Sequence, residues 1–149
     1  MIRIITILLG IWIALLIAAP LMVQSASPSW QVTGTTVYFL ADPVCHQLPE
    51  RCLNINKLPM PVCARCFAIY LGGFIIFVLA WIRQPQVQWP KWIYFITVCF
   101  FFIEVTGEHL NLYHNLFPLR LLSGFVLGVI IFRIILETIV NEKVQLKNG

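Results

Sequence analysis

Residues 4–23 read IITILLGIWIALLIAAPLMV and contain no charged side chain. A helix that crosses a hydrocarbon core about 30 Å thick needs roughly 20 such residues, so this run predicts a transmembrane helix. Arg3 precedes the run, as in a secretory signal peptide, but the apolar part of a signal peptide is usually about 7–15 residues long. We therefore expect residues 4–23 to be retained as a first span.

The composition of the whole chain agrees with a membrane protein. Hydrophobic residues make up 60 % of the 149 residues and charged residues only 11 %, whereas soluble domains have about 25 % charged residues. The net charge is +4, and the ten basic residues are scattered rather than clustered. Because nucleic-acid binding needs a basic patch or stripe, we expect lipid, and not nucleic acid, as the main partner.

Three further apolar runs, at residues 64–82, 90–105 and 119–140, predict three more spans. Trp81, Trp89 and Trp92 lie at the edges of these runs, where aromatic side chains favour the membrane–water interface. The expected fold is an all-α, four-helix membrane bundle that forms one domain over residues 1–149. Residues 24–63 form its long extramembrane loop.

Four spans place both termini and the loop after residue 82 on one side of the membrane. That side carries Arg3, Arg83, Lys91, Lys143 and Lys147. The opposite side carries Arg51, Lys57, Arg65 and Arg120, over longer loops. Because short cytoplasmic loops are enriched in Lys and Arg, we expect cytoplasmic termini and an exoplasmic cysteine loop.

Four of the five cysteines, Cys45, Cys52, Cys63 and Cys66, lie within residues 45–66. The Cys-x-x-Cys pair of Cys63 and Cys66, with Cys45 and His46 upstream, is typical of a zinc site with thiolate and imidazole ligands. The predicted metal ligands are therefore Cys45, His46, Cys63 and Cys66. Cys99 lies alone in an apolar run, where a cysteine usually serves as a small buried hydrophobe.

Two alternatives for the cysteines stay open. Cys63 and Cys66 lie at the start of a predicted helix beside Arg65, and the positive charge there favours reactive redox thiolates. The other alternative is two inert disulfides, Cys45–Cys52 and Cys63–Cys66, that stiffen the loop.

Ionisable residues also occur near the end of the third predicted span, where Glu104 and Glu108 are one helical turn apart and His109 follows. Charged groups at membrane depth are costly and usually have a partner. We expect Arg120 to pair with Glu104 and to lock the third and fourth helices together. Glu104 is also a candidate general base for zinc-assisted hydrolysis.

The motifs Cys45-His46-Gln47 and Cys63-x-Arg65-Cys66-x-x-x-Tyr70-x-Gly72 resemble those of a family of small bacterial membrane proteins catalogued as a domain of unknown function. The likeness covers about residues 35–130. It extends to Glu104 and to Arg120, Ser123, Gly124 and Gly128. The resemblance implies a protein of the bacterial inner membrane. Serine is common in that family at the position of Cys52, which favours Cys45, His46, Cys63 and Cys66 as ligands.

A weaker, architectural likeness is to bacterial four-helix enzymes that pass electrons from thiols to quinone. Those enzymes also place a Cys-x-x-Cys pair at a helix start on the exoplasmic face. This likeness implies a quinone-linked thiol–disulfide oxidoreductase that uses Cys63 and Cys66. A non-catalytic subunit of a larger membrane complex, with structural disulfides, is the third hypothesis.

Overall fold

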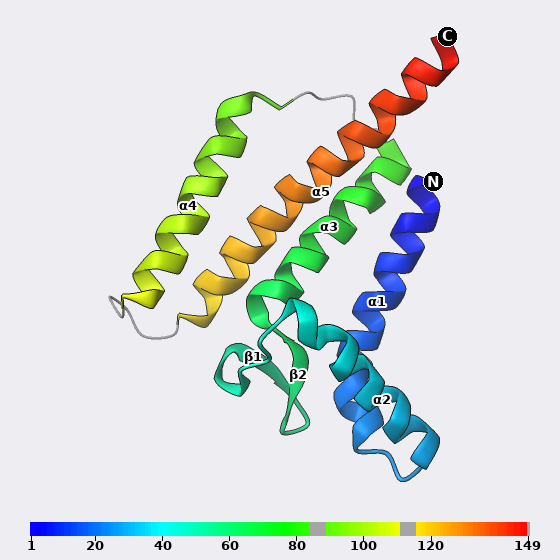
Figure 1. Cartoon of the computed structure of the whole chain (residues 1–149), viewed down its shortest axis with the longest axis vertical. Coiled ribbons are helices and arrows are strands. Elements are labelled where there is room, and N and C mark those ends of the chain that lie inside the picture. Colours follow the sequence, from blue (N-terminus) through cyan, green and yellow to red (C-terminus); the bar gives the residue numbers. More distant parts are fainter. Residues whose placement is uncertain (84–88, 111–115, 149) are drawn as a thin grey trace.

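The computed structural model describes residues 1–83, 89–110 and 116–148, and the side chains of Arg83, His109 and residues 141–148 lie outside that description. The helices of the described part are α1 (Ile2–Val23), α2 (Pro28–Ala41), α3 (Ala64–Arg83), α4 (Lys91–His109) and α5 (Phe117–Asn148) (Figure 1). Two short 3₁₀ helices, η1 (Asp42–Val44) and η2 (Pro49–Arg51), precede the strands β1 (Cys52–Ile55) and β2 (Leu58–Cys63).

Three of the described helices are long and apolar enough to cross a membrane: Ile2–Val23, Ala64–Ile82 and Phe117–Val140. They correspond to the runs predicted at 4–23, 64–82 and 119–140. The run predicted at 90–105 does form a helix, α4, but α4 is not among these three. Glu104 and Glu108 lie in its last turns and reduce its mean hydropathy, so the four-span count is not supported by length and composition alone.

The segment between α1 and α3 is more structured than the loop expected at 24–63. Ser27 caps α2 in an extended conformation, and Pro28 occupies the first turn, where its missing N–H costs nothing. Asn56 and Lys57, with φ of 51° and 70°, form a two-residue turn of the kind that joins antiparallel strands. The fold is therefore mostly helical with a small two-stranded sheet, rather than all-α.

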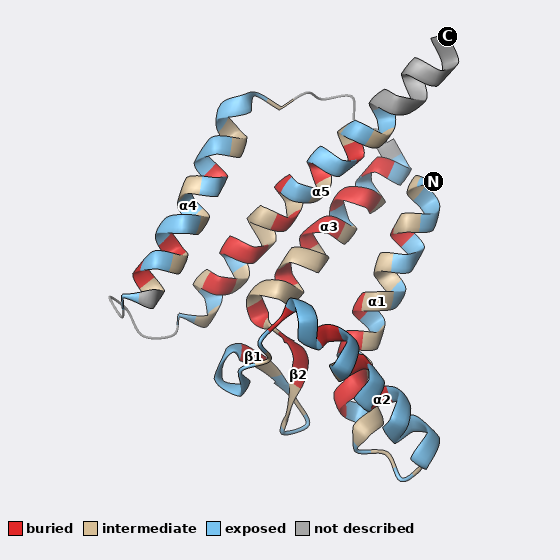
Figure 2. Ribbon diagram, in the orientation of Figure 1, coloured by how far each residue is buried: buried red, intermediate tan, exposed pale blue. Residues whose placement is uncertain are grey.

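The hairpin and α2 pack against the end of α1. Gly34 of α2 lies so close to α1 that an added Cβ would stand 2.8 Å from Val23 and 3.0 Å from the Ala19 carbonyl oxygen. The hydroxyl of Tyr38 donates to the Pro59 carbonyl, joining α2 to β2. A core of Leu16, Ala19, Val37, Ala41, Cys45, Met60 and Val62 fills the space between these elements. Burial of these apolar side chains holds the sheet and α2 against the helices (Figure 2).

Helices α3 and α5 pack closely and in parallel. Gly124 lies against the backbone of Arg65 and Gly128 against that of Ile69, while Gly73 lies against the ring of Phe132. Residue numbers rise together along the two helices, which shows that both run in the same direction (Figure 1). Small residues at these positions let the two backbones approach, as the Gly-x-x-x-Gly spacing predicted.

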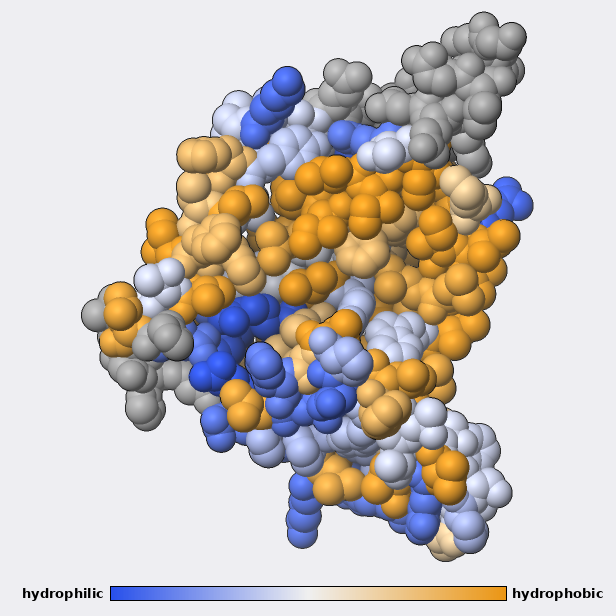
Figure 3. Space-filling model, in the orientation of Figure 1, coloured by the Kyte–Doolittle hydropathy of each residue, from blue (hydrophilic) through white to orange (hydrophobic). Residues whose placement is uncertain are grey.

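Helix α4 lies on the other side of α5 and contacts it through polar groups. The Tyr94 hydroxyl donates to Glu137 at 3.3 Å, and Glu137 also accepts from Arg133 Nε at 3.0 Å. Arg133 is buried and stacks over the Trp89 ring. Figure 3 shows apolar atoms over α1, α3 and α5, and hydrophilic atoms around the hairpin and the nearby end of α4. The molecule thus has an apolar belt with a polar end.

Candidate metal centre

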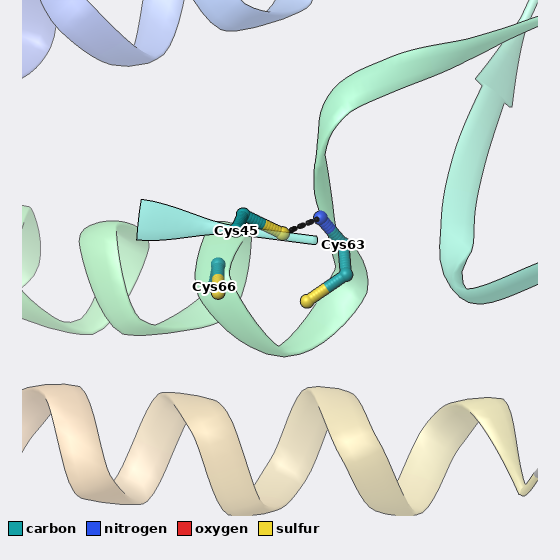
Figure 4. Close-up of side chains that lie close together, drawn as sticks. All are labelled: Cys45, Cys63 and Cys66. Atoms are coloured by element: carbon teal, nitrogen blue, oxygen red, sulfur yellow. Dashed lines mark hydrogen bonds between the residues drawn. The ribbon is translucent and has the colours of Figure 1, made fainter. Parts of the chain in front are cut away.

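Cys45, Cys63 and Cys66 come together at the polar end of the bundle (Figure 4). Their three sulfur atoms all lie within 4.8 Å of one another. Cys45 follows η1, Cys63 ends β2, and Cys66 lies in the first turn of α3. The hairpin fold carries the chain from Cys45 back to the start of α3, so residues that are far apart in the sequence become neighbours.

Hydrogen bonds to the sulfur of Cys45 favour its thiolate form. The backbone N–H of Cys63 donates to this sulfur at 3.1 Å. Hydrogen bonds from the thiols of Cys63 and Cys66, and then from the backbone N–H groups of Cys63 and Gln47, hold the pKa of Cys45 far below its usual value against the opposing effect of burial. Gln47 adopts a left-handed conformation with φ of 49°, and its backbone N–H donates to the sulfur of Cys45. The site is therefore built to hold a negative sulfur.

These three thiols suit an ion that prefers sulfur. In a tetrahedral zinc site with Zn–S bonds of about 2.3 Å, sulfur atoms are roughly 3.8 Å apart. The observed sulfur atoms, all within 4.8 Å, need only a small shift to reach that geometry. Hydrogen bonding to Cys45 and Cys63, and then burial, raise the pKa of Cys66, so an ion bound here would have to displace the proton of that thiol.

The surroundings of the cluster are apolar on one side and open on the other. Cys45 is buried in the core that includes Ala41 and Val62. Cys63 and Cys66 are half-buried. The cluster is therefore sheltered but remains accessible to an ion or a small reagent through Cys63 and Cys66.

Two further residues of the predicted site lie apart from this cluster. His46 is exposed and does not join the group of three sulfur atoms. Cys52 is buried on β1, where it is the antiparallel partner of Cys63. Burial, with the nearby charges of Cys45 and Cys63, raises the pKa of Cys52 to about 11. All five cysteines are free thiols, so the structure contains neither of the disulfides considered from the sequence.

An ionic cluster lies beside the cysteines, where α3, α4 and α5 meet. Arg65 Nη2 binds Glu104 at 2.7 Å and Glu108 at 2.8 Å, and Arg120 Nε binds Glu108 at 3.1 Å. The Ser123 hydroxyl donates to Glu104 at 3.2 Å. The sequence predicted Arg120 as the partner of Glu104, but in these contacts Arg65 binds Glu104 and Arg120 binds Glu108. The side chain of His109, and all of His114, lie outside the described residues.

Arg65 links the two clusters. Its backbone lies within Cys63-Ala64-Arg65-Cys66, and its side chain is bound to α4. The glutamates have a further partner in Arg51, which lies 3.3 Å from Glu108 and is half exposed. Sequence reasoning missed the ion pairs of Arg51 and Arg65. Arg65 lies within the Cys63-x-Arg65-Cys66 motif and Arg51 directly precedes Cys52, but neither position identifies a glutamate partner on α4.

Residues 45–134 match a family described as "Predicted membrane protein (DUF2085)". The chain belongs to this family. The matched DUF2085 segment begins at Cys45 and includes the three clustered cysteines and the whole ionic cluster, with both of its glutamates. Membership shows a membrane protein whose activity is unknown.

The relatives of this DUF2085 chain include uncharacterised archaeal proteins. One, from Methanocaldococcus jannaschii, is 29 % identical over 102 residues, which cover 66 % of this chain and 65 % of the relative. Another, from Methanothermobacter thermautotrophicus, is 44 % identical over 39 residues, 26 % of this chain and 35 % of the relative. The chain thus spans less than two thirds of either relative, and neither supports the expected bacterial origin. No solved structure matches the chain.

Proposed function

We propose that this chain is a membrane protein that binds a thiolate-preferring metal ion, zinc first, through Cys45, Cys63 and Cys66. The observation that carries the proposal is that three sulfur atoms, from the turn after η1, the end of β2 and the first turn of α3, lie within 4.8 Å of one another. A bound ion would fasten the turn at Cys45 and the end of β2 to the start of α3. Its role would be structural or regulatory, because metal binding adds its free energy to the fold.

Zinc held by three thiolates has a fourth position. His46 is the protein residue that the sequence offers for it, and its exposed ring would have to turn toward the sulfur atoms. Otherwise water or a small ligand occupies the position. A hydrolytic role for the ion has less support, because Glu104, the candidate base, is buried and accepts hydrogen bonds from Arg65 and Ser123.

The parallel packing of α3 and α5 supports four crossings of the membrane. If both helices cross in the same direction, the chain between them must cross back. Helix α4 is the described element between them, and it runs opposite to α3 and α5 in Figure 1. Its two glutamates are compatible with this position because arginines pair with them. We therefore include α4 as a fourth span, with both termini on one side.

The distribution of basic residues supports cytoplasmic termini and an exoplasmic metal site. Five Lys and Arg residues lie near the termini or in the short loop after residue 82, and four lie on the cysteine side over longer loops. The positive-inside rule counts Lys and Arg in short loops, so it assigns the side of the termini to the cytoplasm.

Elemental analysis of the purified protein in detergent tests the metal site. We expect one zinc ion, or another thiolate-preferring ion, per chain. Cys63→Ser should lose the ion, and the matched control Cys99→Ser should retain it, since Cys99 lies on α4 away from the cluster. A wild-type protein purified under reducing conditions that neither contains nor takes up such an ion would refute the proposal.

The quinone-linked alternative has no separate observation in its favour. The three sulfur atoms form one group rather than a lone reactive pair of Cys63 and Cys66. The relatives are uncharacterised and suggest no electron-transfer partner. We therefore put the metal site first.

A further inference from the structure

Cys52 and Cys63 face each other across the hairpin. They are partners in the antiparallel pairing of β1 and β2, so their side chains point to the same face of the sheet. Directly opposed residues in antiparallel strands have Cα atoms about 4.5–5.5 Å apart. A disulfide needs Cα atoms about 4.4–6.8 Å apart. The ladder is irregular between Cys52 and Asn54, but Cys52 and Cys63 are still paired across the two strands, which keeps their backbones close enough for a disulfide.

The environment of the two thiols gives them different roles. Cys52 is 6 % exposed and lies outside the three-sulfur group, so it remains a thiol when that group holds an ion. Cys63 is half-buried and is a member of the group. A reagent can reach Cys63 from solution, whereas Cys52, its partner on the neighbouring strand, is buried.

We infer that Cys52 and Cys63 form a redox switch for the metal site, in which a Cys52–Cys63 disulfide takes Cys63 away from the ion. The inference rests on the proposed metal-binding function. With Cys63 oxidised, Cys45 and Cys66 are the two remaining thiolate ligands, and two thiolates hold zinc much more weakly than three. Oxidation thereby releases the ion and loosens the connection between the hairpin and α3.

The oxidant belongs to the class of small disulfides, written RSSR. The Cys63 thiolate attacks one sulfur of RSSR, which forms a mixed disulfide and expels RS⁻. Cys52, as a thiolate, then attacks the Cys63 sulfur, which forms the Cys52–Cys63 bond and expels the second RS⁻. The two protein thiols lose two electrons and two protons, and RSSR becomes two RSH. An exoplasmic site is where such oxidants are met.

The test uses the full-length, metal-loaded protein in detergent, exposed to glutathione disulfide. A chromophoric chelator follows metal release, and mass spectrometry of peptides maps the disulfide. We expect release to accompany a Cys52–Cys63 bond. Cys52→Ser should bind the ion at the wild-type stoichiometry. It should release the ion at least about tenfold more slowly than the wild type, because it lacks the intramolecular closing step. Cys99→Ser is the matched control and should release at the wild-type rate.

Several results would overturn the switch. One is a Cys63–Cys66 or Cys45–Cys63 bond in place of Cys52–Cys63. Another is metal release from Cys52→Ser at the wild-type rate. Cys52→Ala provides a second variant, and its initial metal content checks its folding. If the purified protein binds no metal, the proposed function fails, but mapping the disulfide in the metal-free protein still decides whether Cys52 and Cys63 are the redox pair.

Discussion

At the scale of single residues, the site depends on what surrounds each sulfur. Cys45 receives hydrogen bonds from backbone N–H groups and from neighbouring thiols, whereas Cys52, close by, is buried beside negative charge. The two thiols therefore have pKa values shifted in opposite directions. Their positions in the sequence do not reveal this difference, because it arises from contacts made by the folded hairpin.

The first prediction concerns the ligand set. Cys45→Ser should lower the affinity for zinc more than about 100-fold, since even residues that only orient a ligand are worth about 10–100-fold. His46→Ala should change the affinity less than about threefold, because His46 is exposed and outside the sulfur group. Competition with a chelator measures both affinities. A loss in His46→Ala as large as that in Cys45→Ser would make His46 the fourth ligand.

The second prediction concerns the reactivity of Cys52 in the metal-free protein. Its pKa is raised from 9.0 to about 11, so the neutral thiol is favoured until the pH approaches 11. At pH 8 its thiolate fraction should be about 100-fold below that of an unshifted thiol, and the alkylation rate should rise about tenfold per pH unit up to pH 10. Mass spectrometry measures the rate. Equal rates in the folded and the detergent-denatured chain would contradict this prediction.

At the scale of elements, glycines and ion pairs determine how the helices meet. Gly124 and Gly128 let α5 approach α3 closely, and the Gly-x-x-x-Gly spacing made this contact predictable. The binding of α4 by Arg65 was not predictable from spacing, because Arg65 and Glu104 are far apart in sequence. Periodicity identifies which face of a helix is small or polar, but not which distant element meets that face.

The third prediction tests the α3–α5 contact. Gly128→Leu should destabilise the protein by about 3 kcal/mol, the upper end for overpacking, because the added side chain meets the backbone of Ile69. Thermal unfolding in detergent measures the effect. Leu122→Ala on the same helix is the control, since Leu122 is exposed and its loss should have little effect. Equal stabilities of the two variants would argue against the close contact.

The fourth prediction tests the ionic cluster. Glu104→Gln should destabilise the protein by about 3–5 kcal/mol, because it removes one partner of a buried ion pair with Arg65. No spare acceptor near the arginines compensates for the lost carboxylate charge, since Arg65 Nε and Arg120 Nη1 already lack hydrogen-bond partners among the described residues. Asp42→Asn, at an exposed carboxylate, should leave the stability unchanged within about 0.5 kcal/mol.

At the scale of the whole molecule, the chain forms an apolar set of helices with a polar end that carries both clusters. The N-terminus and the end of α5 lie at the opposite end of the molecule (Figure 1). The hairpin, α2 and the starts of α3 and α5 gather at the polar end (Figures 1 and 3). This division gives the protein a polar end that holds the cysteine and ionic clusters and an apolar belt suited to lipid.

The fifth prediction concerns topology. If α4 is the fourth span proposed above, it returns the chain across the membrane between the parallel helices α3 and α5, and fusion reporters at the N- and C-termini should both report the cytoplasm. A membrane-impermeant thiol reagent should reach Cys63 in intact cells from outside after the metal is removed. Termini on opposite sides would show that α4 does not cross.

The sequence by itself determined the membrane setting and the local part of the site. Apolar runs of about 20 residues define lipid-spanning helices wherever they occur. The spacing of Cys63 and Cys66 places Cys63 just before α3 and Cys66 in its first turn. Tertiary structure decided the rest: the return of Cys45 to that helix by way of a hairpin, the position of His46 outside the group of three sulfur atoms, and the pairing of Arg65 with Glu104. These features depend on packing between distant segments, which local patterns do not encode.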